Sequence, residues 1–94
     1  MFIINYYEEI KNKFLKNETY KKVKDYSKNR SDLNTYFEVG RLLIEAQGGE
    51  ERAKYGNKLI KEYSEKLTME LGKKYNYRNL MYMRKFYLIF RKKK

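Results

Sequence analysis

Residues 57–90, NKLIKEYSEKLTMELGKKYNYRNLMYMRKFYLIF, contain the pattern that decides the fold. Apolar residues recur every three or four positions on both sides of Gly72, which is the spacing of one face of an α-helix. The predicted buried stripes are Leu59, Ile60, Tyr63, Leu67 and Leu71 before the glycine, and Leu80, Met83, Tyr87 and Phe90 after it. Gly72 can end the first helix and Asn76 can cap the second. The sequence therefore predicts a helix-turn-helix over about residues 57–92.

The preceding half of the chain predicts further amphipathic helices. One covers residues 2 to about 16 and ends in a break at 17–19, a weaker one continues to about residue 29, and a third follows with Ser31 as its N-cap. Their apolar stripes are Ile3, Tyr7, Ile10 and Phe14 in the first, and Leu33, Tyr36, Phe37, Gly40, Leu43, Ile44 and Gln47 in the third. A glycine inside a helix costs about 1 kcal/mol relative to alanine, so we expect Gly40 to allow close approach of another helix.

The glycine pair at 48–49 predicts the end of that third helix, and residues 50–56 predict no more than a short helical turn. No linker, repeat or compositional break divides the chain, and 94 residues suit one compact domain. The predicted fold class is therefore all-α, a small bundle of about five helices that forms a single domain over residues 1–94.

The composition excludes several classes of function. The chain has no Cys and no His, which excludes zinc fingers, disulfide scaffolds and Cys or His catalysis. The carboxylate pairs Glu8–Glu9, Glu50–Glu51 and Glu62–Glu65 lie among lysines, as on a solvated helix surface. We therefore expect no catalytic residue, no metal site and no cofactor, and hence a protein that is not an enzyme.

The sequence also predicts where the protein resides. No apolar run approaches the roughly 18 residues that span a bilayer, and the first residues lack the layout of a signal peptide. The apolar segment 87–90 followed by four basic residues resembles an interfacial membrane anchor, but the small core needs those apolar side chains. We expect a cytoplasmic protein that does not bind membranes.

Positive charge is concentrated at the C-terminal end. The formal net charge is +11, and residues 73–94 contain nine basic residues and no acid, the last acid being Glu70. Codon bias would enrich Glu together with Lys, so it does not explain this segregation. Basic residues interleaved with Tyr and Phe predict a surface that binds a polyanion.

The second helix of a helix-turn-helix presents its first turns to the DNA major groove. Arg78, Tyr82, Lys85 and Ile89 fall on one stripe opposite the buried one. Arginine can read guanine and asparagine can read adenine, whereas the other basic side chains suit phosphates. The predicted nucleic-acid-binding residues are Lys73, Lys74, Arg78, Asn79, Tyr82, Lys85, Arg91 and Lys92. Duplex DNA is the favoured ligand, and RNA is left open.

Five short motifs follow one another along the chain: YFEVGR at 36–41, EAQGG at 45–49, EERAKYG at 50–56, YRNL at 77–80 and MRKFY at 83–87. In this order they resemble the N-terminal domain of the YhcG family, also called the domain of unknown function 1016. The resemblance implies a helix-turn-helix module that usually precedes a nuclease domain of the PD-(D/E)xK type. Because this sequence stops at Lys94, we expect no counterpart of that domain's catalytic carboxylates and lysine.

Two alternatives remain open at this point. The chain can be a stand-alone protein-interaction module of a phage or mobile element, for example an inhibitor of an RNA-guided nuclease or of another defence enzyme. A homodimer is compatible with either function, with the stripe of Ile3, Tyr7, Ile10 and Phe14 as the partner face. Packing of that stripe into its own core is the favoured interpretation.

Overall fold

The computed structural model describes residues 5–23, 28–53 and 56–91, and within these ranges the side chains outside residues 19–31. Every regular element in these ranges is helical, which confirms the predicted all-α class. The elements are α1 (Tyr6–Val23), α2 (Lys28–Ala46), the single-turn α3 (Glu50–Ala53), α4 (Lys58–Leu71), the 3-10 turn η2 (Lys73–Tyr75) and α5 (Tyr77–Phe90). No helix in the described ranges is long and apolar enough to cross a membrane.

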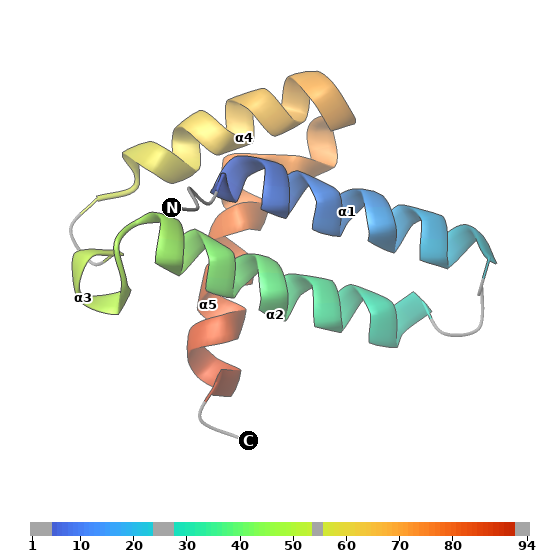
Figure 1. Ribbon diagram of the computed structural model, residues 1–94, viewed down its shortest axis with the longest axis horizontal. Helices are drawn as coiled ribbons and strands as arrows, with labels where there is room; N and C mark the ends of the chain where they lie inside the picture. The colour runs from blue at the N-terminus through green and yellow to red at the C-terminus, as the bar shows by residue number, and fades with distance from the viewer. Residues whose placement is uncertain (1–4, 24–27, 54–55, 92–94) are drawn as a thin grey trace.

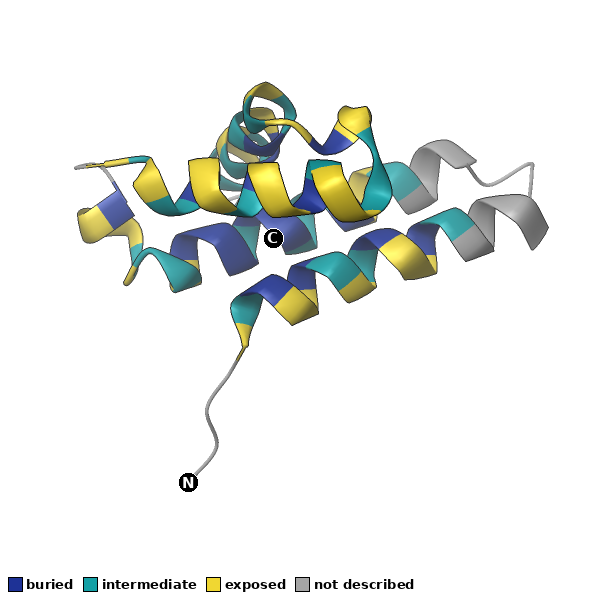
Figure 2. Cartoon of the chain, turned by 90° about the horizontal axis from the view of Figure 1, so that it is seen from above, coloured by how far each residue is buried: buried dark blue, intermediate teal, exposed yellow. Residues whose placement is uncertain are grey.

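Helices α1 and α2 lie side by side and run in opposite directions (Figure 1). Helix α4 lies above this pair, and α5 then turns away from α4 and crosses α2 steeply. Side-chain contacts join α1 to α4. The Tyr7 hydroxyl donates to the Glu70 carboxylate, and Lys11 Nζ lies 3.0 Å from Glu70 Oε2. The buried sides of the helices face one another, while their yellow, exposed sides point outward (Figure 2).

The core draws on four helices and on η2. Its buried members are Tyr7, Ile10, Phe14, Val39, Leu42, Leu43, Ile60, Leu67, Tyr75, Leu80 and Met83. The stripe of α1 is thus buried within its own protomer, except for Ile3, which lies outside the described residues. The described part of that stripe is therefore not exposed for contact with a second copy of the chain.

Several predicted core positions are more exposed than expected. Leu33 near the start of α2 is 51% exposed, and Phe90 at the end of α5 is 44% exposed. Tyr63 and Tyr87 are half-buried. Because α2 and α5 cross at a steep angle, residues near their ends extend beyond the region that the other helices cover.

Two predicted boundaries in the first half are wrong. Helix α1 continues to Val23 through the predicted break at 17–19. The polar residue Asn17 is buried there, and its Nδ2 donates to Asp32 Oδ1 of α2 at 2.9 Å, so it joins two helices rather than ending one. Ser31 is not an N-cap, because α2 already begins at Lys28.

The predicted close approach at Gly40 is confirmed. A Cβ atom on Gly40 would overlap the main-chain oxygen of Met83 and would lie 2.7 Å from the Cβ of Tyr87. The absence of a side chain at Gly40 therefore lets the backbone of α5 rest directly on α2.

The turn between α4 and α5 has the predicted caps. Gly72 adopts φ +125°, a conformation that glycine accepts without steric cost, and its N–H donates to the oxygens of Leu67 and Thr68. Asn76 caps α5, since its side chain accepts from the Asn79 N–H at 3.0 Å. These two residues fix where α4 ends and α5 begins.

We expect Leu80→Ala or Met83→Ala to lower the free energy of unfolding by about 2–5 kcal/mol, because each removes a buried side chain from the centre of the core. Urea denaturation followed by circular dichroism measures this change. Ile89→Ala, on the exposed side of the same helix, serves as the control and should change stability by about 0.5 kcal/mol or less. Equal effects at all three positions would contradict the packing described here.

Gly40→Ala should destabilise the protein by about 1–3 kcal/mol, although alanine is the better helix former. The added methyl group must push α5 away from α2, since the atoms it meets belong to backbone and to a Cβ. Gly56→Ala is the matched control, because a Cβ there meets nothing within 4 Å. Thermal unfolding of both variants tests this expectation, and a stabilised Gly40→Ala protein would refute the close contact.

Candidate nucleic-acid interface

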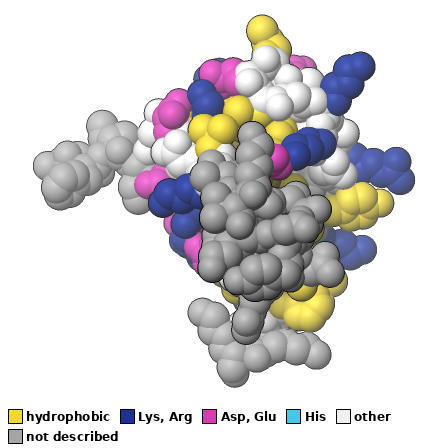
Figure 3. Space-filling view, turned by 90° about the vertical axis from the view of Figure 1, so that its right-hand side faces the viewer, with side chains coloured by type: hydrophobic (Ala, Val, Ile, Leu, Met, Phe, Trp, Pro, Cys, Tyr) yellow, Lys and Arg dark blue, Asp and Glu magenta, His cyan; other side chains and the backbone are white. Residues whose placement is uncertain are grey.

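The outer face of α5, defined by Arg78, Tyr82, Lys85 and Ile89, lies opposite the buried Leu80 and Met83. All four side chains are exposed, Tyr82 to 56% and Ile89 to 51%. The predicted placement of this stripe is therefore confirmed. Basic and hydrophobic side chains also lie close together along the right-hand edge of the space-filling view (Figure 3).

Two basic residues of the C-terminal segment are paired with acids within the fold. Lys74 pairs with the Glu18 carboxylate of α1. Arg91 forms a two-pronged pair with Glu50, at 2.7 Å from Nε to Oε2 and 2.9 Å from Nη2 to Oε1. These two predicted phosphate ligands thus form ion pairs with acids of the same chain. The hydrogen bond to Glu18 also raises the pKa of Lys74, which keeps the pair ionised.

Arg84 joins α5 to Gln47, which directly follows α2, and to Ala53 of α3. Its Nη1 donates to Gln47 Oε1 at 3.0 Å and to the Ala53 oxygen at 3.1 Å, and both acceptors are uncharged. Burial lowers the pKa of this half-buried guanidinium. In the sequence Arg84 is one of the nine basic residues of the C-terminal segment, and no local pattern marks Gln47 and Ala53 as its partners.

Lys73, Arg78 and Lys85 remain exposed to solvent, and none of them has an ion-pair partner within the described part of the chain. The Arg78 guanidinium lies over the Tyr82 ring, 5.9 Å from its centroid. This contact holds an exposed cation in the first turn of α5. These three cations and Tyr82 form the candidate interface.

Asn79 is not on this outer surface. Its Nδ2 donates to the Lys74 oxygen at 2.8 Å, and its backbone N–H is the donor to the Asn76 cap. The side chain is thereby oriented toward the turn between α4 and α5. Lys92 lies outside the described residues.

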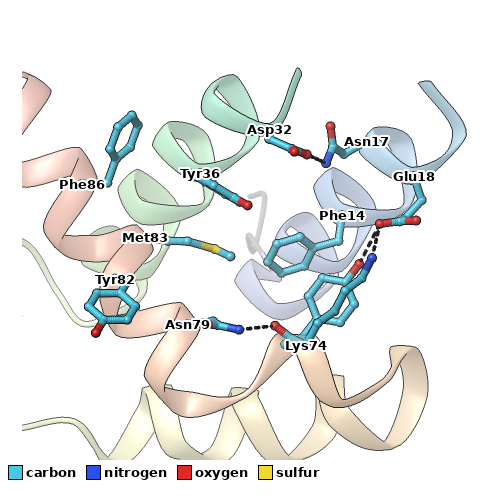
Figure 4. A pocket seen from close by; sticks show the side chains of 11 residues that line it. Phe14, Asn17, Glu18, Asp32, Tyr36, Lys74, Asn79, Tyr82, Met83 and Phe86 are labelled. Atoms are coloured by element: carbon cyan, nitrogen blue, oxygen red, sulfur yellow. Dashed lines mark hydrogen bonds and ion pairs between the residues drawn. The ribbon is translucent and has the colours of Figure 1, made fainter. Parts of the chain in front are cut away.

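A hollow of about 400 Å³ opens beside the start of α5 (Figure 4). It lies between α1, α2 and the η2–α5 segment, and sequence reasoning missed it. Its lining residues are Phe14, Asn17, Glu18, Asp32, Tyr36, Lys74, Tyr75, Asn79, Tyr82, Met83 and Phe86. These residues are spread over almost the whole chain, so only their helical spacing was visible in the sequence. Three of the predicted interface residues, Lys74, Asn79 and Tyr82, line this hollow.

The hollow contains partly buried polar groups, among them the Tyr75 hydroxyl and the Glu18 carboxylate. Burial raises the pKa of Tyr75, whose hydroxyl lies 3.4 Å from Glu18 Oε1. The described residues contain no group of three or more His, Cys, Asp or Glu side chains that could hold a metal ion.

Comparison with known proteins gives a family. Residues 6–94 match the model of the DUF1016 N-terminal domain. Over 57 residues the chain is 47% identical to an Escherichia coli K12 protein named "Putative nuclease YhcG", a match that covers 60% of this chain and 15% of that protein. No solved structure matches the chain significantly. The family match covers nearly the whole chain, so the chain belongs to the family of DUF1016 N-terminal domains.

Proposed function

We propose that this chain is a non-catalytic module that binds duplex DNA through the outer face of α5. The observation that carries the proposal is the set of three exposed cations, Lys73, Arg78 and Lys85, without ion-pair partners among the described residues. Other cations of the same segment are neutralised by acids or bonded to neutral groups inside the fold. The charge that remains at the surface is therefore available to phosphates.

The geometry of α4 and α5 agrees with this function. Gly72 and the Asn76 cap fix the start of α5, and Arg78 in its first turn is exposed, which is compatible with a recognition helix that enters the major groove. Arg78 stands in those first turns and can donate two hydrogen bonds to a guanine edge. No acidic residue follows Glu70 to repel the phosphates.

The relative supports a nucleic-acid ligand. Its name, "Putative nuclease YhcG", refers to an enzyme class whose substrate is nucleic acid, and the match covers 15% of its length. Holding the nucleic acid beside a catalytic domain is a role that fits the matched part of that relative. The carboxylates Glu62 and Glu65 are exposed on α4.

A second candidate function rests on a different observation. Tyr82, Ile89 and Phe90 leave large apolar areas exposed along α5, and apolar area at a surface is typical of a protein-binding site. In this alternative the helix docks on a protein, such as an RNA-guided nuclease or another defence enzyme that the chain inhibits as a phage or mobile-element product. A homodimer through α5 belongs to the same alternative.

We expect duplex DNA to bind with an affinity that falls with salt, because phosphate contacts release counterions. If Lys73, Arg78 and Lys85 each neutralise one phosphate, the slope of log K against log salt is about −3, and Lys85→Ala flattens it by about one. Arg78→Ala should also reduce discrimination between sequences by about 1–3 kcal/mol. Fluorescence anisotropy with duplex DNA and duplex RNA at several salt concentrations measures these effects.

Lys16→Ala removes the same charge from the exposed side of α1 and is the control that should leave the slope nearly unchanged. Absence of DNA binding at low salt would overturn the proposal. Capture of a defined nuclease that is lost in Ile89→Ser but retained in Lys85→Ala would support the protein-binding alternative instead.

A further inference from the structure

A groove of about 530 Å³ runs along the side of α5, next to its outer face. The half-buried part of its lining is a row of side chains at intervals of four, three and four positions: Tyr77, Met81, Arg84 and Leu88. This repeat is the spacing of the seam along which two helices pack in a coiled coil. All described residues that line the groove belong to α5, so within the described part of the chain the seam has only one side.

The groove continues toward α2 and α3. A smaller cavity of about 280 Å³ shares Arg84 and Leu88 with the groove and is also lined by Ile44 and Ala53. From Tyr77 to Arg91, which lines the far end of this cavity, the track is about 21 Å long at 1.5 Å per residue. A track of this length fits an elongated occupant, such as a helix of about four turns.

The groove is flanked by positive charge. Arg78 and Lys85 are exposed at its edge, and neither has an ion-pair partner among the described residues. Arg84 lies within the row itself, and its hydrogen-bond acceptors are uncharged. Glu50, an acid at the far end of the track, is paired with Arg91. An occupant that complements this lining therefore places carboxylates beside three cations.

Three kinds of occupant can be compared with this lining. Duplex DNA offers few apolar groups, chiefly the thymine methyls of the major groove, so it would contact the cations and leave most of the row uncovered. A second copy that paired its own α5 with this helix would bring like charges together, because residues 73–94 contain no acid. An amphipathic helix with acids beside its apolar stripe supplies both the apolar contacts and the opposite charge.

We propose that this groove binds an acidic amphipathic helix of a partner protein, with apolar side chains against Met81 and Leu88 and carboxylates beside the three cations. Arg78 and Lys85 belong both to the groove and to the candidate DNA interface. The bound helix therefore displaces DNA, a consequence that rests on the proposed function, whereas the docking itself does not. The groove gives a partner protein the means to regulate DNA binding.

The experiment uses the full chain and two synthetic peptides of about fifteen residues, long enough to form a helix when bound. One has leucines at alternating intervals of four and three positions with glutamates beside them, and the other has the same composition in scrambled order. We expect the patterned peptide to bind about tenfold more tightly, because the two carry equal charge and only one has an apolar stripe. Fluorescence anisotropy measures both affinities. Unlabelled patterned peptide should also release labelled duplex DNA.

Leu88→Ser tests the apolar row. Leu88 lines the groove but lies outside the candidate DNA interface, so the variant should bind the patterned peptide about tenfold more weakly and retain its affinity for duplex DNA. Leu33→Ser removes an exposed leucine of α2 and should change neither affinity.

Lys85→Glu is a second test that changes only an exposed side chain, so it applies even if Leu88→Ser does not fold. It should weaken binding of the patterned peptide about tenfold or more, because a carboxylate then faces carboxylates. Circular dichroism melting verifies that each variant is folded.

The outcomes separate docking from DNA binding. If both peptides bind equally and salt abolishes both, the attraction is one of charge alone and the groove is refuted, whether or not DNA binds. If the patterned peptide is preferred but duplex DNA does not bind, the docking site is supported and the DNA-binding function is refuted. If peptide and DNA bind together, or if Leu88→Ser weakens DNA rather than the peptide, the helix is not the occupant of this groove and the inference is overturned.

Discussion

The contact between Gly40 of α2 and the backbone of α5 at Met83 is the constraint on which the rest of the structure depends. Because α5 rests directly on α2, its buried residues Leu80 and Met83 reach the centre of the core. The same crossing turns the opposite side of α5 outward. A larger residue at Gly40 would move α5 as a unit, so the packing of the core and the exposure of the candidate interface are set together.

Net charge alone overstates the size of the interface. The segment 73–94 contains nine basic residues, yet Lys74, Arg84 and Arg91 have partners within the fold. Lys74 joins the turn before α5 to α1, while Arg84 and Arg91 join α5 and its C-terminal end to Gln47 and to α3. These contacts position the helix. A basic segment at the end of a small domain thus serves two purposes, since part of its charge anchors the helix and part remains on its surface.

Helical periodicity and local capping were sufficient to predict most of the fold. The stripes around Gly72 and the cap at Asn76 are encoded by residues near one another in the sequence. The close approach at Gly40 was visible as a glycine inside a helical stripe, although its contacts, Met83 and Tyr87, are distant in the sequence. The errors arose where polar residues act over long sequence separations. Asn17 looked like a helix end because its partner in α2 is fifteen positions away, and no local pattern reveals such a bond. The hollow was missed for the same reason.

The turn between α4 and α5 adjoins both the hollow and the outer face of α5. Asn79 reaches back to the Lys74 oxygen, and Lys74 reaches across to Glu18, so one chain of contacts runs from α5 through the turn to α1. Lys73 and Arg78, which flank this chain of contacts, point to solvent. The residues at this end of the hollow and those of the outer face therefore lie on either side of one turn. The Asn76 cap fixes where α5 begins, so it sets the position of both.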